Sequence, residues 1–332
     1  MKRRSLTYFP VDSRLRTDRI PTLLIYLSRQ GKKIEWRQAL ARSFRGAAAG
    51  GSKMGIGRVG SVLDSGLILF HAMLLKDQVA LITGSGRGIG RGIAKLFAEQ
   101  GAAVFLTART QTELAATARE IGDAGGKTAF LAGDLASEAD CRAMAAKAAE
   151  TFGRVDILVN NGGHYGPVVP VEEYPIVEFD KVVAVHLRAA FLLSQLVLPG
   201  MYERKHGVIL NISSISAKAA FSWGSAYAAA KAGLLGLTRY NAAEGARKGV
   251  RVNAICPGPV TETVMSKELG AELARKLNLS KEEQLAGFLN SILQGRGQSA
   301  AEIAQAALFL CSDQASAITG QSVNVDGGAV FC

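Results

Sequence analysis

Short apolar runs alternate with longer amphipathic segments along most of this chain, beginning at Gln78. Apolar runs of about four to eight residues that end in turn residues indicate buried strands, and apolar residues spaced three and four apart indicate helices. The expected strands are 78–83, 103–107, 128–132, 155–160, 207–212, 250–256 and 322–325. The expected helices are 90–99, 111–121, 137–152, 179–201, 226–246, 267–293 and 300–311.

This alternation predicts the fold class. Strands that alternate with helices form βαβ units, whose parallel strands share one sheet with helices on both faces. The sequence therefore predicts an α/β fold over residues 73–332: a single doubly wound, Rossmann-type domain with a parallel sheet of about seven strands.

Residues 1–72 do not continue the alternation, and they carry most of the net charge. They hold 14 Lys and Arg against 4 Asp and Glu, whereas the remaining residues hold 25 against 24. We expect a basic extension that is not a folded domain, either a transit peptide or an extension from an upstream start codon. Met73 is a natural beginning for the compact domain, and we expect a chain that starts there to fold and bind cofactor.

Composition and charge limit the classes of partner that we expect for this protein. A net charge of +11 would suit nucleic acid, but it lies in an extension without a nucleic-acid-binding motif, so we expect no such partner. No apolar run approaches the roughly 18 residues that span a bilayer, and no signal peptide is apparent. We therefore expect a cytoplasmic protein without a membrane partner. The scattered cysteines indicate reduced thiols and no metal site: Cys141, Cys256, Cys311 and Cys332.

A glycine-rich loop joins the first expected strand to the first expected helix, in the sequence Thr-Gly-Ser-Gly-Arg-Gly-Ile-Gly over 83–90. Gly84 permits the tight turn, Gly88 lets the backbone approach a pyrophosphate, and Gly90 lets the helix pack on the sheet. The helix N-terminus offers N–H groups to the phosphates. The loop predicts a dinucleotide site, with a purely structural turn as the alternative. The expected cofactor contacts are Gly84, Arg87, Gly88, Ile89 and Gly90.

The end of the second expected strand indicates which dinucleotide binds. An NAD site usually has a carboxylate here for the ribose 2′-hydroxyl, but none occurs before Glu113. Arg109 follows the strand instead, and Arg87 lies in the glycine loop. Two guanidinium groups suit a 2′-phosphate, which predicts a preference for NADP(H). The alternative is two solvated arginines, with NAD(H) used as well.

A serine, a tyrosine and a lysine supply candidate catalytic groups. Tyr227 and Lys231 are four residues apart on an expected helix, so both side chains can enter one cleft. The pKa of a tyrosine, ordinarily about 10, is high for proton exchange near neutral pH. A nearby ammonium group and an oxidised nicotinamide would lower that pKa. Ser214 follows the fifth expected strand, where its hydroxyl can orient a substrate oxygen.

Several motifs, in order, resemble the short-chain dehydrogenase/reductase family, and the resemblance covers Met73 to Cys332. It is carried by the glycine loop, Asp134, the Asn-Asn-Gly-Gly run at 160–163, Ser214, the Tyr-Ala-Ala-Ala-Lys run at 227–231, Pro257-Gly258, the Ile-Thr-Gly-Gln run at 318–321 and the Val-Asp-Gly-Gly run at 325–328.

The resemblance implies a Rossmann-type fold and hydride transfer to or from a nicotinamide. It implies that Tyr227 is the general acid/base, that Ser214 positions the carbonyl, and that Lys231 lowers the tyrosine pKa and holds the nicotinamide ribose. It also places Asp134 and Leu135 beside the adenine, and Asn161 and Val260 beside the nicotinamide half.

This sequence departs from the family pattern at three positions. Gly162 stands where the family often has alanine. His186 replaces the helix asparagine that commonly anchors a water in a proton relay; it either serves that relay or is a structural histidine. Glu262, flanked by Thr261 and Thr263, stands where a threonine often contacts the carboxamide, so that contact is shifted or lost.

The substrate is a small carbonyl compound or alcohol by the same resemblance. The core resembles 3-oxoacyl-carrier-protein reductases, whereas the long stretch 273–294, which forms the substrate lid in the family, resembles dehydrogenases of small hydroxy acids and sugar alcohols. A third alternative is a non-catalytic dinucleotide sensor. We expect residues 164–165 and 167–170 to border the pocket.

The expected helix at 179–201 is apolar around much of its circumference. One sheet face cannot cover all of that surface, so a second helix surface is needed. The family resemblance implies a homotetramer built partly on this helix, and a monomer covered by the extension is the alternative.

Overall fold

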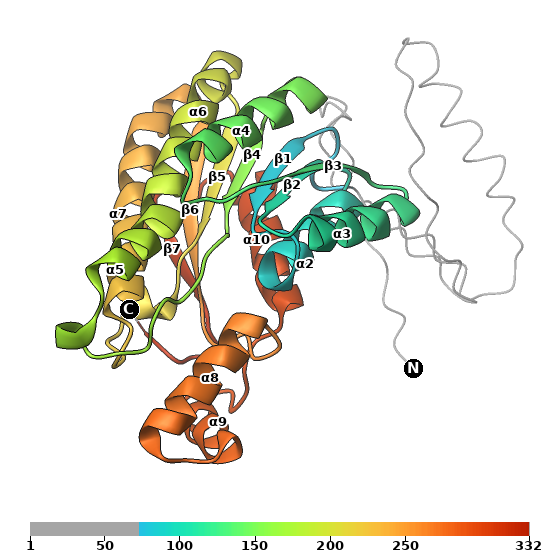
Figure 1. Ribbon diagram of the computed structural model, residues 1–332. Helices are drawn as coiled ribbons and strands as arrows, with labels where there is room; N and C mark the ends of the chain where they lie inside the picture. The colour runs from blue at the N-terminus through green and yellow to red at the C-terminus, as the bar shows by residue number, and fades with distance from the viewer. Residues whose placement is uncertain (1–72, 332) are drawn as a thin grey trace, which may run out of the picture. The chain divides into compact units, whose positions relative to one another are not determined.

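The computed structural model describes residues 73–331, so the predictions for residues 1–72 lie outside the described part of the chain. Seven strands form one sheet in the order β3-β2-β1-β4-β5-β6-β7, and every neighbouring pair is parallel (Figure 1). The order reverses between β1 and β4, as in a doubly wound fold. The predicted fold class is confirmed, and strand ends differ from expectation by at most two residues. The strands are β1 (Val79–Thr83), β2 (Ala103–Ala108), β3 (Lys127–Ala132), β4 (Ile157–Asn160), β5 (Gly207–Ile212), β6 (Val250–Pro257) and β7 (Ser322–Val325).

Helices cover both faces of the sheet (Figure 1). One face carries α2 (Gly88–Glu99), α3 (Gln111–Asp123) and α10 (Ala300–Cys311). The other carries α4 (Glu138–Phe152), α6 (Ala189–Arg204) and α7 (Ser225–Gly245). Short 3-10 turns occur at η2 (Val171–Glu173), η4 (Ile215–Ala217), η5 (Ala246–Lys248) and η6 (Asp313–Ala315).

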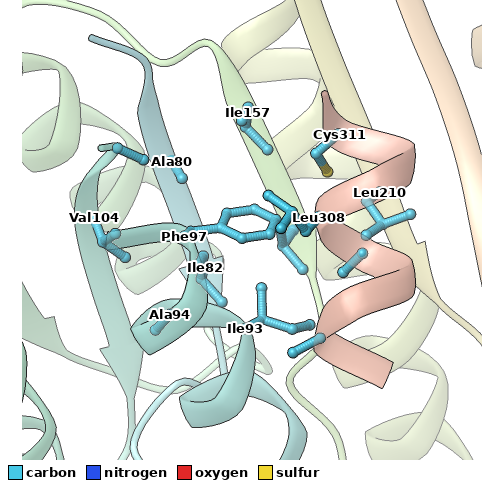
Figure 2. Packing of buried hydrophobic residues seen from close by; sticks show 14 of the residues in the cluster. Ala80, Ile82, Ile93, Ala94, Phe97, Val104, Ile157, Leu210, Leu308 and Cys311 are labelled. Carbon is cyan, nitrogen blue, oxygen red and sulfur yellow. The ribbon is translucent and has the colours of Figure 1, made fainter. Parts of the chain in front are cut away.

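The strand sequences explain this arrangement. Successive side chains of a strand point to opposite faces, so Ala80 and Ile82 of β1 join the core under α2 and α10, while Leu81 joins the core under α6. Figure 2 shows Phe97 of α2 reaching across β1 towards Leu308 of α10. Both faces of the strand are buried because helices lie on both, which is why β1 is apolar throughout.

The expected helix at 179–201 is interrupted. It consists of α5 (Ile176–Val183), the π-helical turn η3 (Ala184–Arg188) and α6. By length and composition the stretch Ile176–Arg204 could cross a membrane, but 56% of its most apolar window is buried inside the domain. The interruption matters for the site, because π-turns insert one extra residue and redirect side chains.

The expected helix at 267–293 is two helices, α8 (Val264–Leu277) and α9 (Lys281–Asn290). Asn278 ends α8 with a left-handed φ of 54°, and Ser280 begins α9 with a capping box to Glu283. These helices lie beyond the carboxyl edge of the sheet (Figure 1). We call residues 264–290 the lid.

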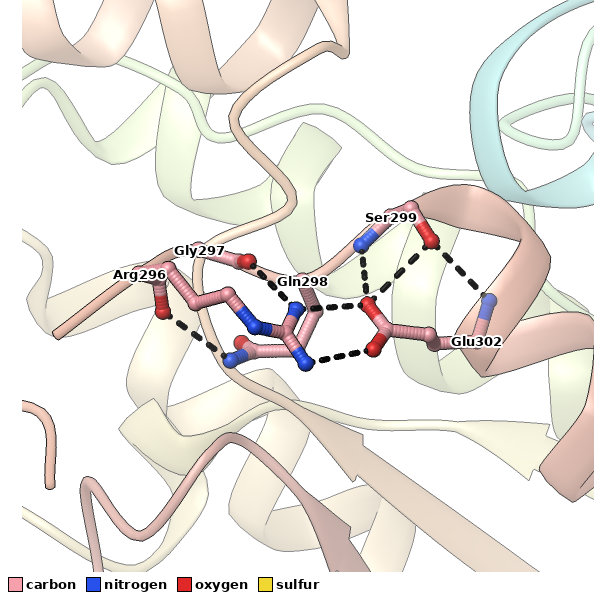
Figure 3. Close-up of polar contacts among 5 residues, drawn as sticks. All are labelled: Arg296, Gly297, Gln298, Ser299 and Glu302. Atoms are coloured by element: carbon pink, nitrogen blue, oxygen red, sulfur yellow. Dashed lines mark hydrogen bonds and ion pairs between the residues drawn. The ribbon is translucent and has the colours of Figure 1, made fainter. Parts of the chain in front are cut away.

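A polar cluster fixes the chain between the lid and α10 (Figure 3). The guanidinium of Arg296 donates to both carboxylate oxygens of Glu302, at 2.7 and 3.0 Å. Glu302 also completes a capping box with Ser299 at the start of α10. Because α10 belongs to the core, this cluster anchors the C-terminal end of the lid to the rigid part of the domain.

Candidate active site and cofactor cleft

A cleft of about 570 Å³ opens at the carboxyl ends of the strands, where the loops after β1 to β6 meet. It brings together residues from distant parts of the sequence. Gly90 lies behind the wall. The predicted site residues on the wall are Gly84, Arg87, Gly88, Ile89, Arg109, Asp134, Leu135, Asn161, His186, Ser214, Tyr227, Lys231 and Val260.

The glycine loop is shaped to hold an anion. Gly84 adopts a left-handed φ of 65°, and a Cβ at Gly90 would overlap the carbonyl oxygen of Gly84, so α2 packs directly on the loop. No side chain caps the N-terminus of α2, and its first turn contains no acidic residue. Gly88 and Ile89 line the cleft there, so the positive end of the helix fits the pyrophosphate of a dinucleotide.

Asn161 holds this loop from behind. Its side-chain amide donates to the carbonyl oxygens of Thr83 at 2.9 Å and Gly84 at 3.2 Å. Asn161 therefore positions the glycine loop as well as lining the cleft. At Gly162, a Cβ would lie 2.5 Å from Cδ1 of Leu135, so an alanine here would require the end of the Leu135 side chain to shift.

Two arginines and one carboxylate meet beside the loop. Arg87 and Arg109 are exposed at the cleft. Glu113 of α3 also lines the cleft, and its carboxylate pairs with the Arg87 guanidinium at 3.4 Å. From the sequence, Glu113 is expected only in the helix that follows the strand. The fold returns it to the loop, because α3 packs beside α2.

The predicted catalytic side chains converge. Tyr227 and Lys231 lie one turn apart on α7, and both are buried with Ser214 at the base of the cleft. The Lys231 ammonium donates to the carbonyl oxygen of Ile212 at 2.6 Å and lies 5.5 Å from the centre of the Tyr227 ring. The Ser214 hydroxyl accepts the backbone N–H of Ser216 at 3.1 Å. The arrangement places one hydroxyl, one phenol and one ammonium group in a single buried corner.

Burial determines the pKa values of the Tyr227 phenol and the Lys231 amino group. It raises the pKa of Tyr227 to about 12, and the hydrogen bond from Ser214 offsets only part of that rise. Burial also lowers the pKa of Lys231 to about 7. Burial therefore opposes the lowering of the tyrosine pKa that is expected from Lys231 and an oxidised nicotinamide. Tyr227 is protonated at neutral pH.

His186 lies on the π-turn η3 and is buried next to Tyr227, with ring centres 5.2 Å apart. Its Nε2 lies 2.7 Å from the carbonyl oxygen of His164, whereas its Nδ1 has no partner in the described structure. Burial and the Lys231 charge hold its pKa well below the usual range, so the ring is neutral. A Cβ at Gly163 would overlap the ring, so this glycine makes room for the histidine.

The wall opposite the glycine loop was only partly predicted. His164 and Tyr165 line the cleft as expected, and the Tyr165 ring stacks on Tyr227 at 4.8 Å. Residues 167–170 do not line the cleft, so that expectation was wrong. Phe221 and both lid helices complete the wall.

Glu262 has a structural partner. Its carboxylate accepts the N–H of Ala300, at the start of α10, at 2.7 Å. Thr263 caps α8, where its hydroxyl donates to Val260 and accepts the N–H of Ser266. Glu262, which stands where the family often has a threonine, therefore connects the chain just before the lid to α10 of the core.

The described residues show no metal centre. Within residues 73–331, no group of three or more His, Cys, Asp or Glu is arranged to hold a metal ion. Cys141, Cys256 and Cys311 are buried free thiols, and Cys332 lies outside the described residues.

The chain is similar in sequence and fold to known oxidoreductases. A family model described as enoyl-(acyl carrier protein) reductase matches residues 83–330. D-beta-hydroxybutyrate dehydrogenase from Cupriavidus necator is 35% identical over 77% of this chain and 99% of its own length. Levodione reductase from Leifsonia aquatica is 38% identical over 76% of this chain and 94% of its own. A crystal structure of an actinorhodin polyketide ketoreductase variant with NADPH superposes with a TM-score of 0.73, at 34% identity, over 76% of this chain and 97% of that one.

Proposed function

This chain belongs to the short-chain dehydrogenase/reductase family of NAD(P)-dependent oxidoreductases, and on that premise we propose that it transfers a hydride between NADP(H) and a carbonyl group or secondary alcohol, as a 3-oxoacyl reductase does. The observation that carries the proposal is the buried corner of Ser214, Tyr227 and Lys231 beside a loop shaped for a pyrophosphate. A non-catalytic sensor would not need these three groups in one cleft.

Each residue of the corner has a distinct task. When bound, NADPH supplies the hydride that adds to the carbonyl carbon, and it leaves as NADP⁺. The Ser214 hydroxyl orients the carbonyl oxygen, and the Tyr227 phenol transfers its proton to that oxygen, so the product is a neutral alcohol. Lys231, whose Nζ donates to the carbonyl oxygen of Ile212, would hold the nicotinamide ribose.

Protonated Tyr227 is the form that carbonyl reduction uses at neutral pH. A phenol with a pKa near 12 is present almost wholly as the acid that reduction consumes. The reverse reaction needs phenolate, so we expect alcohol oxidation to become faster as the pH rises towards that value.

The preference for NADP(H) is supported by Arg87 and Arg109 at the cleft. A charge-assisted hydrogen bond of about 1.5–3 kcal/mol corresponds to roughly a ten- to hundredfold preference. Glu113 is the observation that favours a second candidate, an NAD(H)-dependent dehydrogenase of a small hydroxy acid or sugar alcohol, because its carboxylate can accept a ribose hydroxyl.

The surface of α6 and α7 supports assembly into a homotetramer. Phe191 is 53% exposed and Tyr240 is 72% exposed, and they flank a shallow apolar hollow. Exposed aromatic residues that gather in this way mark an interaction surface. We call this surface, to which α5 contributes Val183 and η3 contributes Leu187, the α6–α7 patch. Its apolar residues are Val183, Leu187, Phe191, Leu237 and Tyr240.

Initial rates with a panel of ketones, each run with NADPH and with NADH, test the proposal. We expect ketone-dependent oxidation of the reduced cofactor, with kcat/KM for NADPH at least about tenfold above that for NADH at low salt. Absence of turnover with every ketone would contradict the proposed reaction. Equal use of both cofactors would contradict the preference and favour the second candidate.

A further inference from the structure

We propose that the substrate is a neutral ketone or 3-oxoacyl ester with an apolar body, and not a carboxylate, a phosphate or a polyol. This inference rests on the proposed function and names the substrate class of the same site. It follows from the distribution of apolar and charged side chains along the cleft.

The cleft has two ends, which the strand order defines. Arg109 and Asp134 follow β2 and β3, on one side of the sheet, whereas Ser214 follows β5 and the lid follows β6 on the other. A dinucleotide bound at the loop after β1 fills the first end and reaches Tyr227. The substrate then occupies the second end, between the catalytic corner and the lid.

Apolar side chains form the wall of this second end. Phe221 comes from the loop after Ser214, and the others come from both lid helices. Phe221 is 45% exposed and Leu285 is 41% exposed, so an apolar substrate would remove substantial hydrophobic surface from water. The apolar residues of this wall are Phe221, Met265, Leu269, Leu273, Leu285 and Phe288.

Phe221 and the lid contribute no cation to the cleft. The described cations that line it are Lys231, Arg87 of the glycine loop, Arg109 after β2 and Lys181 of α5 (Ile176–Val183). A substrate carboxylate held against the wall of Phe221 and the lid would therefore lose water without gaining a charged partner from that wall, which is costly.

Nearby lysines are directed elsewhere. Lys218 donates to the carbonyl oxygen of Ser322 at 2.9 Å, and Lys276 lies over the Trp223 ring at 5.9 Å from its centre. Neither residue lines the cleft.

The wall formed by the Phe221 loop and the lid also carries few hydrogen-bonding side chains. They are those of Ser222, Ser266 and Gln284. A polyol buries several hydroxyl groups, and each one left without a partner costs binding energy. One carbonyl on an apolar skeleton matches two catalytic hydroxyls and an apolar wall.

Matched substrates test the proposal on the full chain. The 3-oxobutanoate ion and its ethyl ester present the same carbonyl with and without a negative charge. We expect kcat/KM with NADPH to be at least about tenfold higher for the ester. Among ethyl 3-oxoalkanoates of increasing length, kcat/KM should rise up to about fourfold for each methylene that the wall covers.

A pair of lid variants tests the missing cation directly. Leu285→Arg supplies a positive charge at a half-exposed position, and Leu285→Gln removes the same apolar surface without adding charge. We expect Leu285→Arg to raise the acid-to-ester ratio of kcat/KM by about tenfold, and Leu285→Gln to leave that ratio within about twofold while lowering kcat/KM for the ester.

The outcomes separate this inference from the proposed function. Turnover of the acid as fast as the ester overturns the inference and leaves the oxidoreductase assignment intact, whereas no turnover of any ketone overturns both. Binding supplies a readout that does not need turnover: hexanamide and hexanoate differ in charge at nearly equal shape. Quenching of bound NADPH fluorescence should show tighter binding of the amide by about tenfold, and equal or tighter binding of hexanoate would overturn the inference.

Discussion

The Lys231 ammonium lies 5.5 Å from the centre of the Tyr227 ring, one helical turn along α7, and both side chains are buried. The shared desolvation moves their pKa values in opposite directions, that of Lys231 down to about 7 and that of Tyr227 up to about 12. Both shifts favour the neutral side chain, because burial penalises charge.

The first prediction concerns stability and pH. Between pH 7 and about 10, Lys231 is protonated in the unfolded chain but has lost its proton in the folded protein. The free energy of unfolding therefore rises with pH in this range, by up to about 1.4 kcal/mol per pH unit. Lys231→Met lacks this contribution. Urea unfolding of both proteins from pH 6 to pH 10 should show the wild type gaining stability relative to the variant above pH 7. Parallel pH profiles would show that Lys231 keeps an ordinary pKa.

The second prediction concerns cofactor choice. Glu113 pairs with Arg87 at 3.4 Å and would repel a 2′-phosphate, so it limits the preference for NADPH. Glu113→Gln should raise the NADPH-to-NADH ratio of kcat/KM by about tenfold, and Arg87→Gln, the matched neutral change at the other partner, should lower it. The effect should shrink at high salt, because Arg87 is 57% exposed. An unchanged NADPH-to-NADH ratio of kcat/KM in Glu113→Gln would mean that the carboxylate does not interact with the bound cofactor.

The third prediction concerns the histidine on the π-turn. The Nδ1 of His186 has no partner in the described structure and can hold a water beside Lys231 and Tyr227. The asparagine that commonly occupies this position in the short-chain dehydrogenase/reductase family holds a water in the same way. His186→Leu should lower kcat by about tenfold with little change in cofactor KM, and His186→Asn should restore part of the loss. Thermal unfolding of each variant reports any damage to packing. A His186→Leu enzyme with wild-type kcat would identify a structural histidine.

The fourth prediction concerns assembly. Phe191→Asp puts a charge into the α6–α7 patch and should convert the expected tetramer to a smaller species, because a buried unpaired charge disfavours the interface. Val171→Asp is the matched control, since Val171 is 71% exposed and lies outside the patch. Light scattering on the full chain gives the mass of each protein. A wild type that is already monomeric would contradict the homotetramer.

Much of the fold could be predicted because its signals are local. Each strand is an apolar run bounded by turn residues, and the glycine loop and the Tyr227–Lys231 spacing depend on neighbours in sequence. The split of the lid also had a local signal, since Asn278 and the Ser280–Glu283 capping box mark a helix end and a helix start. The prediction of a single helix at 267–293 is wrong because apolar spacing continues through this helix end and helix start.

Other features have no local signal. The π-turn around His186 depends on how α5 and α6 pack, and apolar periodicity cannot distinguish it from a continuous helix. The Arg87–Glu113 contact forms only when α3 returns to the glycine loop. The direction of the Tyr227 pKa depends on how deeply the phenol is buried, and sequence spacing reveals the neighbouring lysine but not the loss of water.

Steady-state kinetics of Tyr227→Phe is the most direct test of the central proposal, that the buried Tyr227 phenol supplies the proton in hydride transfer. The change removes one oxygen and keeps the ring that stacks on Tyr165, so the fold and NADPH binding should persist, with bound-cofactor fluorescence as the control. We expect kcat for ketone reduction to fall by about 10²- to 10⁴-fold. A variant that binds NADPH and reduces ketones at nearly the wild-type rate would contradict the assigned role.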